Sequence, residues 1–204
     1  MTIYEKLKSW LESRVSHAYV MGGTGQPCTP SYRKARAAQY PASAGNIKKY
    51  CQVLSGKKST CDGCKYQGKR AYDCAQLTRW AANHVGIKLV SGATSQWKKT
   101  EWGAKGEIDS LPSGKMCMVF RQDDSNTMGH VGWYMGDGTV IHARGHSYGV
   151  VRTPVNETKW THWGIPVQLY RAEATGEEKP DFKTRLEAVI KELELLLDEC
   201  NPSS

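Results

Sequence analysis

The feature that most constrains the fold is a change of hydrophobic pattern near Met116. Before it, apolar residues recur at helical spacing over residues 2–15 and 74–85, and a shorter helix is expected over 93–99. After it come short β-rich segments bounded by Gly, Pro, Asp or Asn, at residues 116–121, 130–135, 139–144, 149–153 and 166–170. Helices followed by a meander of strands predict an α+β domain in which the helices pack on an antiparallel sheet.

The positive charge of the chain is concentrated in one stretch. Residues 26–70 hold ten Lys and Arg against one acidic residue, Asp62, so the net charge of this stretch is +9. The whole chain has a net charge of +8, so all other residues together sum to −1. The stretch is poor in Leu, Ile and Val, which indicates an insertion carried on a larger domain. Its cations could bind an anionic polymer, or nucleic acid with tyrosines stacking on bases; a solvated basic loop is the alternative.

The same insertion contains four of the seven cysteines. Cys61 and Cys64 form a Cys-x-x-Cys pair, and Cys28 and Cys51 would complete a set of four thiolates. A structural zinc ion on these four residues would explain how a polar segment stays folded. Disulfides and free thiols are the alternatives.

The C-terminal part of the chain has its own pattern. After a linker at residues 172–180, apolar residues recur at helical spacing over 181–200, with acidic residues around them. This predicts one amphipathic helix, which would either pack on the domain or assemble the chain into a homo-oligomer. No run of 18 apolar residues occurs, so no membrane span is predicted, and residues 1–14 lack the apolar core of a signal peptide.

Cys74 is the candidate nucleophile. It stands at the start of the predicted 74–85 helix, behind Asp73 as N-cap, where free N–H groups and the helix dipole lower the pKa of a thiol. The alternative interpretation is that Cys74 is simply a small buried residue of the core. A nucleophilic cysteine also needs a histidine base and a third group that orients the histidine ring. His130 opens one predicted strand and His142 lies in the next.

The loop between these two strands decides whether the histidines meet. If residues 136–138 (Gly-Asp-Gly) form a three-residue loop, Met135 pairs with Thr139 and His142 lies opposite Gly132. The two histidines are then diagonal neighbours on one face, about 7–8 Å apart at the backbone. A two-residue loop would place them on opposite faces.

Several segments resemble the NlpC/P60 peptidases in the order that this family has them. They are Ala18–Gly23, Tyr72–Cys74, Leu111–Gly114 leading into Val119–Phe120, Gly129–Gly138 and Ile141–Ala143. The most specific part is the His-Val-Gly-x-Tyr-x-Gly sequence that starts at His130, followed by Ile-His-Ala. The resemblance covers about residues 1–25 and 71–171.

The resemblance implies a papain-like α+β catalytic domain over residues 1–171, interrupted by the 26–70 insertion. It implies hydrolysis of bacterial peptidoglycan peptides, at the γ-D-glutamyl–diamino acid bond, without a catalytic cofactor. Cys74 would be the nucleophile, His130 the general base and His142 the orienting third member. Tyr19 would help to stabilise the oxyanion and Asp73 would position the substrate.

The implied enzyme acts on the bacterial cell wall, where anionic wall polymers become the expected partner of the insertion. Without a signal peptide, release by another route is expected, as for a phage or prophage enzyme. The family pattern is broken at Ala75 and Gln76, where Ser-Gly is usual, and by the insertion, which could form one wall of the cleft. The rival readings are a CHAP-type N-acetylmuramoyl-L-alanine amidase, which usually has Glu or Asn in place of His142, and a non-catalytic zinc-containing binding module.

Overall fold

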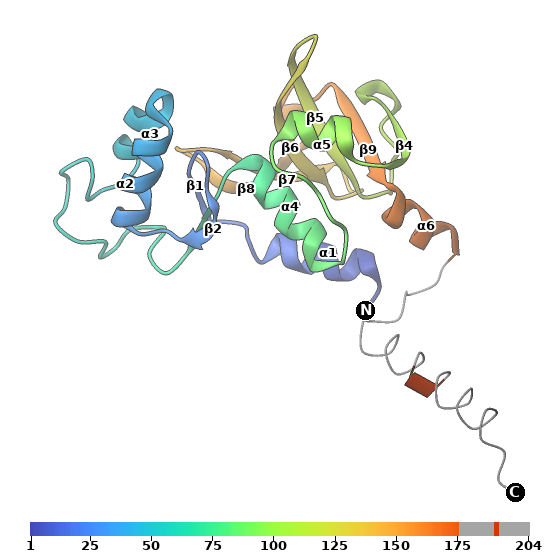
Figure 1. Ribbon diagram of the computed structural model, residues 1–204, viewed down its shortest axis with the longest axis horizontal. Coiled ribbons are helices and arrows are strands. Elements are labelled where there is room, and N and C mark those ends of the chain that lie inside the picture. The colour runs from blue at the N-terminus through green and yellow to red at the C-terminus, as the bar shows by residue number, and fades with distance from the viewer. Residues whose placement is uncertain (176–189, 192–204) are drawn as a thin grey trace, which may run out of the picture.

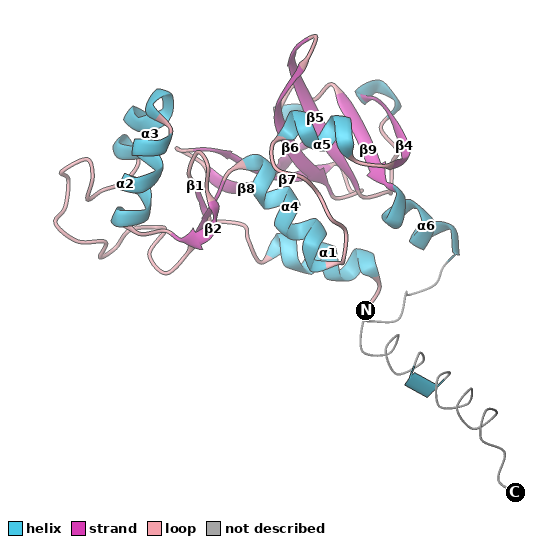
Figure 2. Cartoon of the chain, in the orientation of Figure 1, coloured by secondary structure: helices cyan, strands magenta, loops and turns pink. Residues whose placement is uncertain are grey.

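The computed structural model describes residues 1–175 and 190–191. Figures 1 and 2 show helices packed against a strongly twisted sheet, with a smaller helical lobe at one end of the molecule. The described α-helices are α1 (Ile3–Glu12), α2 (Pro30–Gln39), α3 (Ala44–Lys49), α4 (Cys74–His84), α5 (Ala93–Lys99) and α6 (Val167–Thr175).

Nine strands form two sheets in the described part of the chain. The larger sheet is antiparallel, as expected, with the order β4-β9-β5-β6-β7-β8. Its strands are β4 (Trp102–Glu107), β5 (Cys117–Asp124), β6 (Thr127–Tyr134), β7 (Thr139–Gly145), β8 (Gly149–Pro154) and β9 (His162–Pro166). The smaller sheet, β1-β3-β2, consists of β1 (Ala18–Tyr19), β2 (Thr24–Pro27) and β3 (Arg70–Tyr72).

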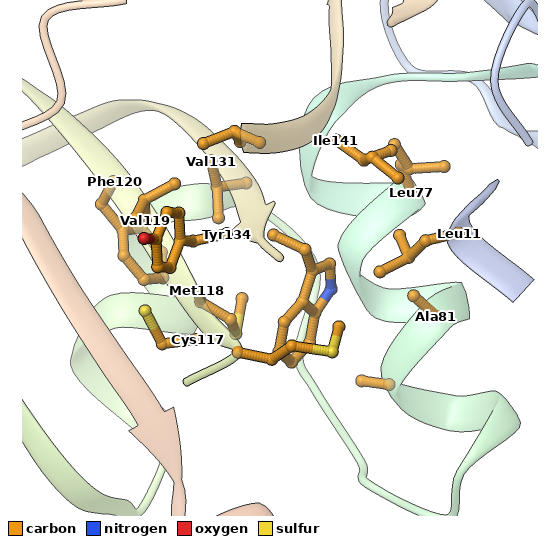
Figure 3. Close-up of a cluster of buried hydrophobic side chains, with 14 of the residues drawn as sticks. Leu11, Leu77, Ala81, Cys117, Met118, Val119, Phe120, Val131, Tyr134 and Ile141 are labelled. Atoms are coloured by element: carbon orange, nitrogen blue, oxygen red, sulfur yellow. The ribbon is translucent and has the colours of Figure 1, made fainter. Parts of the chain in front are cut away.

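The main core lies between helices α1, α4 and α5 and the larger sheet. Figure 3 shows Leu77 and Ala81 of α4, with Leu11 of α1, facing apolar side chains that come from β5, β6 and β7. Trp133 of β6 is fully buried, and its indole N–H donates to the Thr78 carbonyl of α4 at 3.4 Å. Helix α4, which begins at the candidate nucleophile Cys74, is therefore fixed to the sheet through side-chain packing along its buried face.

Capping residues set where α1 and α4 begin. Thr2 and Glu5 form a reciprocal capping box at the start of α1. Asp73 caps α4, since its carboxylate accepts a hydrogen bond from the Gln76 backbone N–H at 2.7 Å. The predicted start of the helix at Cys74 is thereby confirmed.

The 26–70 insertion forms a small lobe whose core is shared with the smaller sheet. Helices α2 and α3 pack on the smaller sheet through a cluster of six buried residues: Ala18, Val20, Ala37, Ile47, Tyr66 and Ala71. Its ends return to the domain as strands β2 and β3, which pair antiparallel. The insertion is therefore built onto the edge of the domain that carries the start of α4.

Two sequence expectations need correction. Residues 166–170 were expected to form a strand, but β9 lies earlier and Val167 opens α6, in which Leu169 is buried and Tyr170 is 41 % exposed. Helix α6 also includes the first residues of the expected 172–180 linker. The rest of that linker and the predicted 181–200 helix lie outside the described residues, except for the helical residues 190–191. Within the described part of the chain, no helix is both long and apolar enough to cross a bilayer.

The packing of α4 predicts the cost of a single truncation. Leu77 is fully buried between α4 and the sheet, so Leu77→Ala should lower the free energy of unfolding by about 2–5 kcal/mol. Val90→Ala is the matched control, because Val90 is 40 % exposed and its truncation should cost less than about 0.5 kcal/mol. Urea unfolding followed by tryptophan fluorescence measures both. Equal losses in the two variants would contradict this account of the core.

Candidate active site

The hairpin between β6 and β7 brings the two predicted histidines together. Trp133 pairs with Ile141, Tyr134 with Val140, and the Met135 N–H donates to the Thr139 carbonyl at 2.8 Å. The Gly-Asp-Gly segment therefore forms the three-residue loop that the sequence analysis considered. Its two glycines both have a positive φ, +84°.

His130 and His142 are hydrogen-bonded to each other. His130 Nε2 and His142 Nδ1 lie 2.8 Å apart, and His142 Nε2 lies 3.3 Å from the Thr153 hydroxyl of β8. Both rings are buried, with His130 7 % and His142 1 % exposed. Because its Nε2 is engaged by His142, His130 has only Nδ1 left to exchange a proton with another group.

Trp160 encloses this pair of rings. Its indole stacks on His130 with an interplanar angle of 14° and meets His142 edge-on. Trp160 was not among the site residues expected from the sequence. No pattern in the sequence near Trp160 indicates this contact, because Trp160 lies between β8 and β9 and meets the histidines only in the folded protein.

The thiol of Cys74 lies against the backbone of β6. Burial, and after it the Asp73 carboxylate, raise the pKa of this thiol to about 12, although the backbone N–H groups of Val131 and Ala75 stabilise the thiolate and oppose the shift. Val131 directly follows His130 in the chain. The thiol of the candidate nucleophile therefore lies at the backbone of the residue that follows the candidate base.

The imidazoles are neutral at ordinary pH. Burial, and after it the charges of His142, Arg121 and Arg144, lower the pKa of His130 to about 3. Burial and Arg144 lower the pKa of His142 to about 4. Because the pKa of the Cys74 thiol is raised, the candidate nucleophile and both histidines are neutral in the resting site.

Tyr19 and Asp73 lie beside the thiol. Tyr19 is 8 % exposed, and burial, followed by the charges of Cys74 and Asp73, raises its pKa, so the phenol remains protonated as a hydrogen-bond donor. Burial raises the pKa of Asp73 to about 6, although hydrogen bonds from the backbone of Gln76, Gly22 and Ala75 oppose the shift. Both residues that the resemblance assigned to substrate contact thus lie next to Cys74.

His146 is a neighbour of the site that was not among the residues expected from the sequence. It lies in the turn between β7 and β8, and its ring meets the Tyr19 ring edge-on at 4.8 Å between centroids. Burial and Arg33 lower its pKa to about 4. The insertion holds this turn, since Lys65 Nζ donates to the Ser147 carbonyl at 3.1 Å. The insertion therefore contacts the rim of the site.

The departure from Ser-Gly after the nucleophile changes the floor of the site. Ala75 is buried, and the Gln76 side chain donates to the Ser91 hydroxyl at 2.8 Å. Arg79 in turn donates to the Gln76 carboxamide oxygen at 3.4 Å. Ala75 therefore offers no hydroxyl, and the Gln76 amide, which stands where glycine is usual, is held by Ser91 and Arg79.

The zinc prediction is not supported. No group of three or more His, Cys, Asp or Glu among the described residues is arranged to hold a metal ion, and the thiols of Cys28, Cys51, Cys61 and Cys64 are free. The buried guanidinium of Arg33 donates to the Cys28 sulfur at 3.2 Å. A fixed positive charge at that sulfur opposes the binding of a cation.

Comparison with known proteins identifies relatives over most of this domain. A peptidoglycan DL-endopeptidase, CwlO, of Bacillus licheniformis is 35 % identical over 72 residues, which are 35 % of this chain and 15 % of that protein. A probable endopeptidase of Corynebacterium glutamicum is 31 % identical over 123 residues, or 60 % of this chain and 53 % of that protein. The chain thus spans about half or less of the length of these curated relatives.

Solved structures share the fold at low sequence identity. The P60 domain of an antigen from M. avium subspecies paratuberculosis has a TM-score of 0.50 and 17 % identity, with 81 % of this chain and 94 % of that chain covered. The peptidoglycan hydrolase RipB of Mycobacterium tuberculosis has a TM-score of 0.50 and 17 % identity, with coverage of 81 % and 64 %.

The family comparison includes the three candidate catalytic residues. The model of the NlpC/P60 family matches residues 61–168, more than half of the chain, a range that contains Cys74, His130 and His142 and leaves out Tyr19. The fold, the matched range and the curated relatives agree with one another. This chain belongs to the NlpC/P60 family of cysteine peptidases.

Proposed function

We propose that this chain hydrolyses peptide bonds of bacterial peptidoglycan, with Cys74 as nucleophile, His130 as general base and His142 as the residue that orients His130. The observation that carries the proposal is the 2.8 Å hydrogen bond between the two imidazoles; the residue after His130, Val131, contacts the Cys74 thiol through its backbone N–H. A neutral amide requires a strong nucleophile and a proton for its leaving amine, and this set of residues supplies both.

The tautomers needed for this chemistry form one consistent chain. If His130 Nδ1 accepts the thiol proton, its Nε2–H donates to His142 Nδ1, and His142 Nε2–H donates to Thr153. The positive charge that forms on His130 is then stabilised by the lone pair of His142 Nδ1. General base catalysis of this kind contributes roughly 10²–10⁴-fold to the rate.

The proton moves in a closed cycle. His130 takes the thiol proton as sulfur attacks the carbonyl carbon, and gives it to the leaving nitrogen as the amide bond breaks. Water then attacks the thioester while His130 accepts one of its protons, and that proton returns to the Cys74 sulfur when the acid product leaves. The Cys74 backbone N–H, at the start of α4, and the Tyr19 hydroxyl are the proposed donors to the oxyanion.

We assign cleavage to the γ-D-glutamyl–diamino acid bond. The curated relative from B. licheniformis is named a DL-endopeptidase, and this name supports the choice of bond. His142 at the third position argues against a CHAP-type amidase, which usually places Glu or Asn there. Because peptidoglycan is the proposed substrate, the proposed site of action is the bacterial cell wall.

Replacement of the nucleophile tests the reaction. Cys74→Ala should abolish the release of peptides from purified peptidoglycan, whereas Cys117→Ala, which changes a cysteine buried in β5, should retain it. Mass spectrometry of the soluble products should find new γ-glutamyl carboxyl ends with the wild type and with Cys117→Ala only. New N-terminal alanine on the stem peptide would instead identify an amidase, and release by Cys74→Ala would contradict the proposed mechanism.

The raised pKa of Asp73 predicts an acid limb in the pH profile. As the pH falls through about 6, Asp73 takes up a proton and loses the charge proposed to position substrate, so kcat/KM for a soluble muropeptide should fall. His130, with a pKa of about 3, stays neutral over this range and cannot produce the limb.

Asp73→Asn separates this titration from the helix cap. Asn also caps helices, so α4 should still begin at Cys74, while the group that titrates is removed. The variant should be less active than the wild type but should show no limb between about pH 5 and pH 7. An unchanged limb near pH 6 in this variant would assign the titration to another group.

We also propose that the insertion binds anionic wall polymers. Seven of its basic residues are exposed on one small lobe: Lys34, Lys48, Lys49, Lys57, Lys58, Lys65 and Arg70. Asp62 is the only acidic residue in residues 26–70, so these charges are largely uncompensated within the lobe. A polymer of phosphodiesters held there would keep the enzyme on its insoluble substrate.

Salt dependence and charge removal test this second proposal. Binding to purified Gram-positive walls that carry teichoic acid should weaken at least about tenfold between about 50 and 200 mM salt, because bound counterions are released on binding. Changing Lys48, Lys49, Lys57 and Lys58 together to Gln should weaken binding, whereas the same change at the exposed residues Lys6, Lys8, Lys98 and Lys99 should not. Equal binding to walls stripped of teichoic acid would contradict the proposal.

A further inference from the structure

A cationic pocket lies directly beside the histidine pair. Its cavity of about 360 Å³ is lined by both catalytic histidines, by Arg121 of β5 and Arg144 of β7, and by Lys159 from the segment between β8 and β9. This volume lies within the range of about 300–1,000 Å³ that is usual for small-molecule sites. The pocket can therefore receive part of a substrate.

The charges around this pocket are mostly positive. Arg144 Nη1 pairs with Glu157 at 2.8 Å, and Arg121 Nε pairs with Asp123 at 2.9 Å on the exposed side. Lys159 is exposed and has no salt-bridge partner among the described residues. Three cations thus face the pocket against one carboxylate, Glu157, and the arginines already oppose protonation of His130.

The position of the pocket identifies the part of the substrate that enters it. In the proposed reaction, His130 donates a proton to the leaving nitrogen, so this nitrogen must come within hydrogen-bonding distance of the His130 ring. The pocket is lined by that same ring. A group held in the pocket therefore belongs to the leaving half of the substrate, next to the nitrogen that is released.

We propose that this pocket is a subsite for a carboxylate carried by the leaving half of the substrate. The inference rests on the proposed peptidase function and extends it to substrate selection. Guanidinium groups recognise carboxylates through paired N–H donors, and an ammonium group adds a point charge. An amine at the same place would be repelled by Arg121, Arg144 and Lys159.

The proposed subsite selects substrates by the carboxyl group of the leaving residue. A leaving residue whose carboxyl group is free, or a diamino acid with a second carboxylate, is preferred over one whose carboxyl group is amidated. The bound carboxylate also offsets the two arginine charges that disfavour a proton on His130. A substrate of the preferred kind would therefore help to stabilise the imidazolium that forms during attack.

The test uses two synthetic peptides that differ in one group. Both contain the γ-D-glutamyl–diamino acid bond, and the leaving residue ends in a free carboxylate in one and in a carboxamide in the other. Cleavage by the wild type gives kcat and KM for each peptide, and calorimetry on Cys74→Ala gives the affinity for each peptide without turnover. The measured quantity is the ratio of carboxylate to carboxamide, in kcat/KM and in affinity.

The subsite predicts how this ratio changes with charge. The wild type should prefer the carboxylate by about 5- to 10-fold, and Lys159→Gln and Arg121→Gln should each reduce the ratio toward one. Glu157→Gln should increase the ratio, because it removes the competing carboxylate from Arg144. Lys88→Gln is the matched control, since Lys88 is an exposed lysine that lines a separate hollow along α4, and it should leave the ratio unchanged.

Two results would overturn the subsite. One is equal affinity of Cys74→Ala for the two peptides, and the other is a wild-type ratio that survives in Lys159→Gln and Arg121→Gln alike. Failure of the proposed function gives a different pattern: neither peptide is cleaved, while the affinity of Cys74→Ala still favours the carboxylate and supports the subsite.

Discussion

The hydrogen bond between His130 and His142 is the interaction on which the site depends. At 2.8 Å it occupies His130 Nε2 and leaves Nδ1 as the nitrogen that can act on the thiol. Thr153 contacts the far nitrogen of His142, and Trp160 stacks on His130, so both rings are held in one orientation. Two neutral imidazoles in a buried pair also avoid the cost of an isolated buried charge before substrate arrives.

This hydrogen bond is a consequence of strand register. The three-residue loop at 136–138 places His142 opposite Gly132, and a Cβ at Gly132 would lie 2.9 Å from the Cβ of His142. Glycine at position 132 therefore makes room for the His142 side chain. A slip of one residue would turn His142 to the opposite face and break the pair. The backbone of β6 and β7 thus carries the geometry that the reaction needs.

Local signals were enough to predict part of this arrangement. The start of α4 followed from Asp73 as a cap, and Gly-Asp-Gly allowed the observed register as one of two loop lengths, because both signals depend on neighbours in the chain. Trp160 was not predicted as a site residue, since its contacts with the histidines are tertiary. Strand β4 was missed because Gly103 and Gly106 weaken its β pattern, and it forms only through pairing with β9 at the sheet edge.

The central claim is that Cys74 forms a covalent thioester with the acyl half of the substrate. Rapid acid quenching during turnover, followed by intact-mass and peptide mass spectrometry, measures this intermediate directly. The account predicts an added mass equal to the γ-glutamyl acyl fragment, located on the peptide that contains Cys74, and its absence in Cys74→Ala. Product release with no adduct on Cys74 at any quenching time, together with activity in Cys74→Ala, would contradict it.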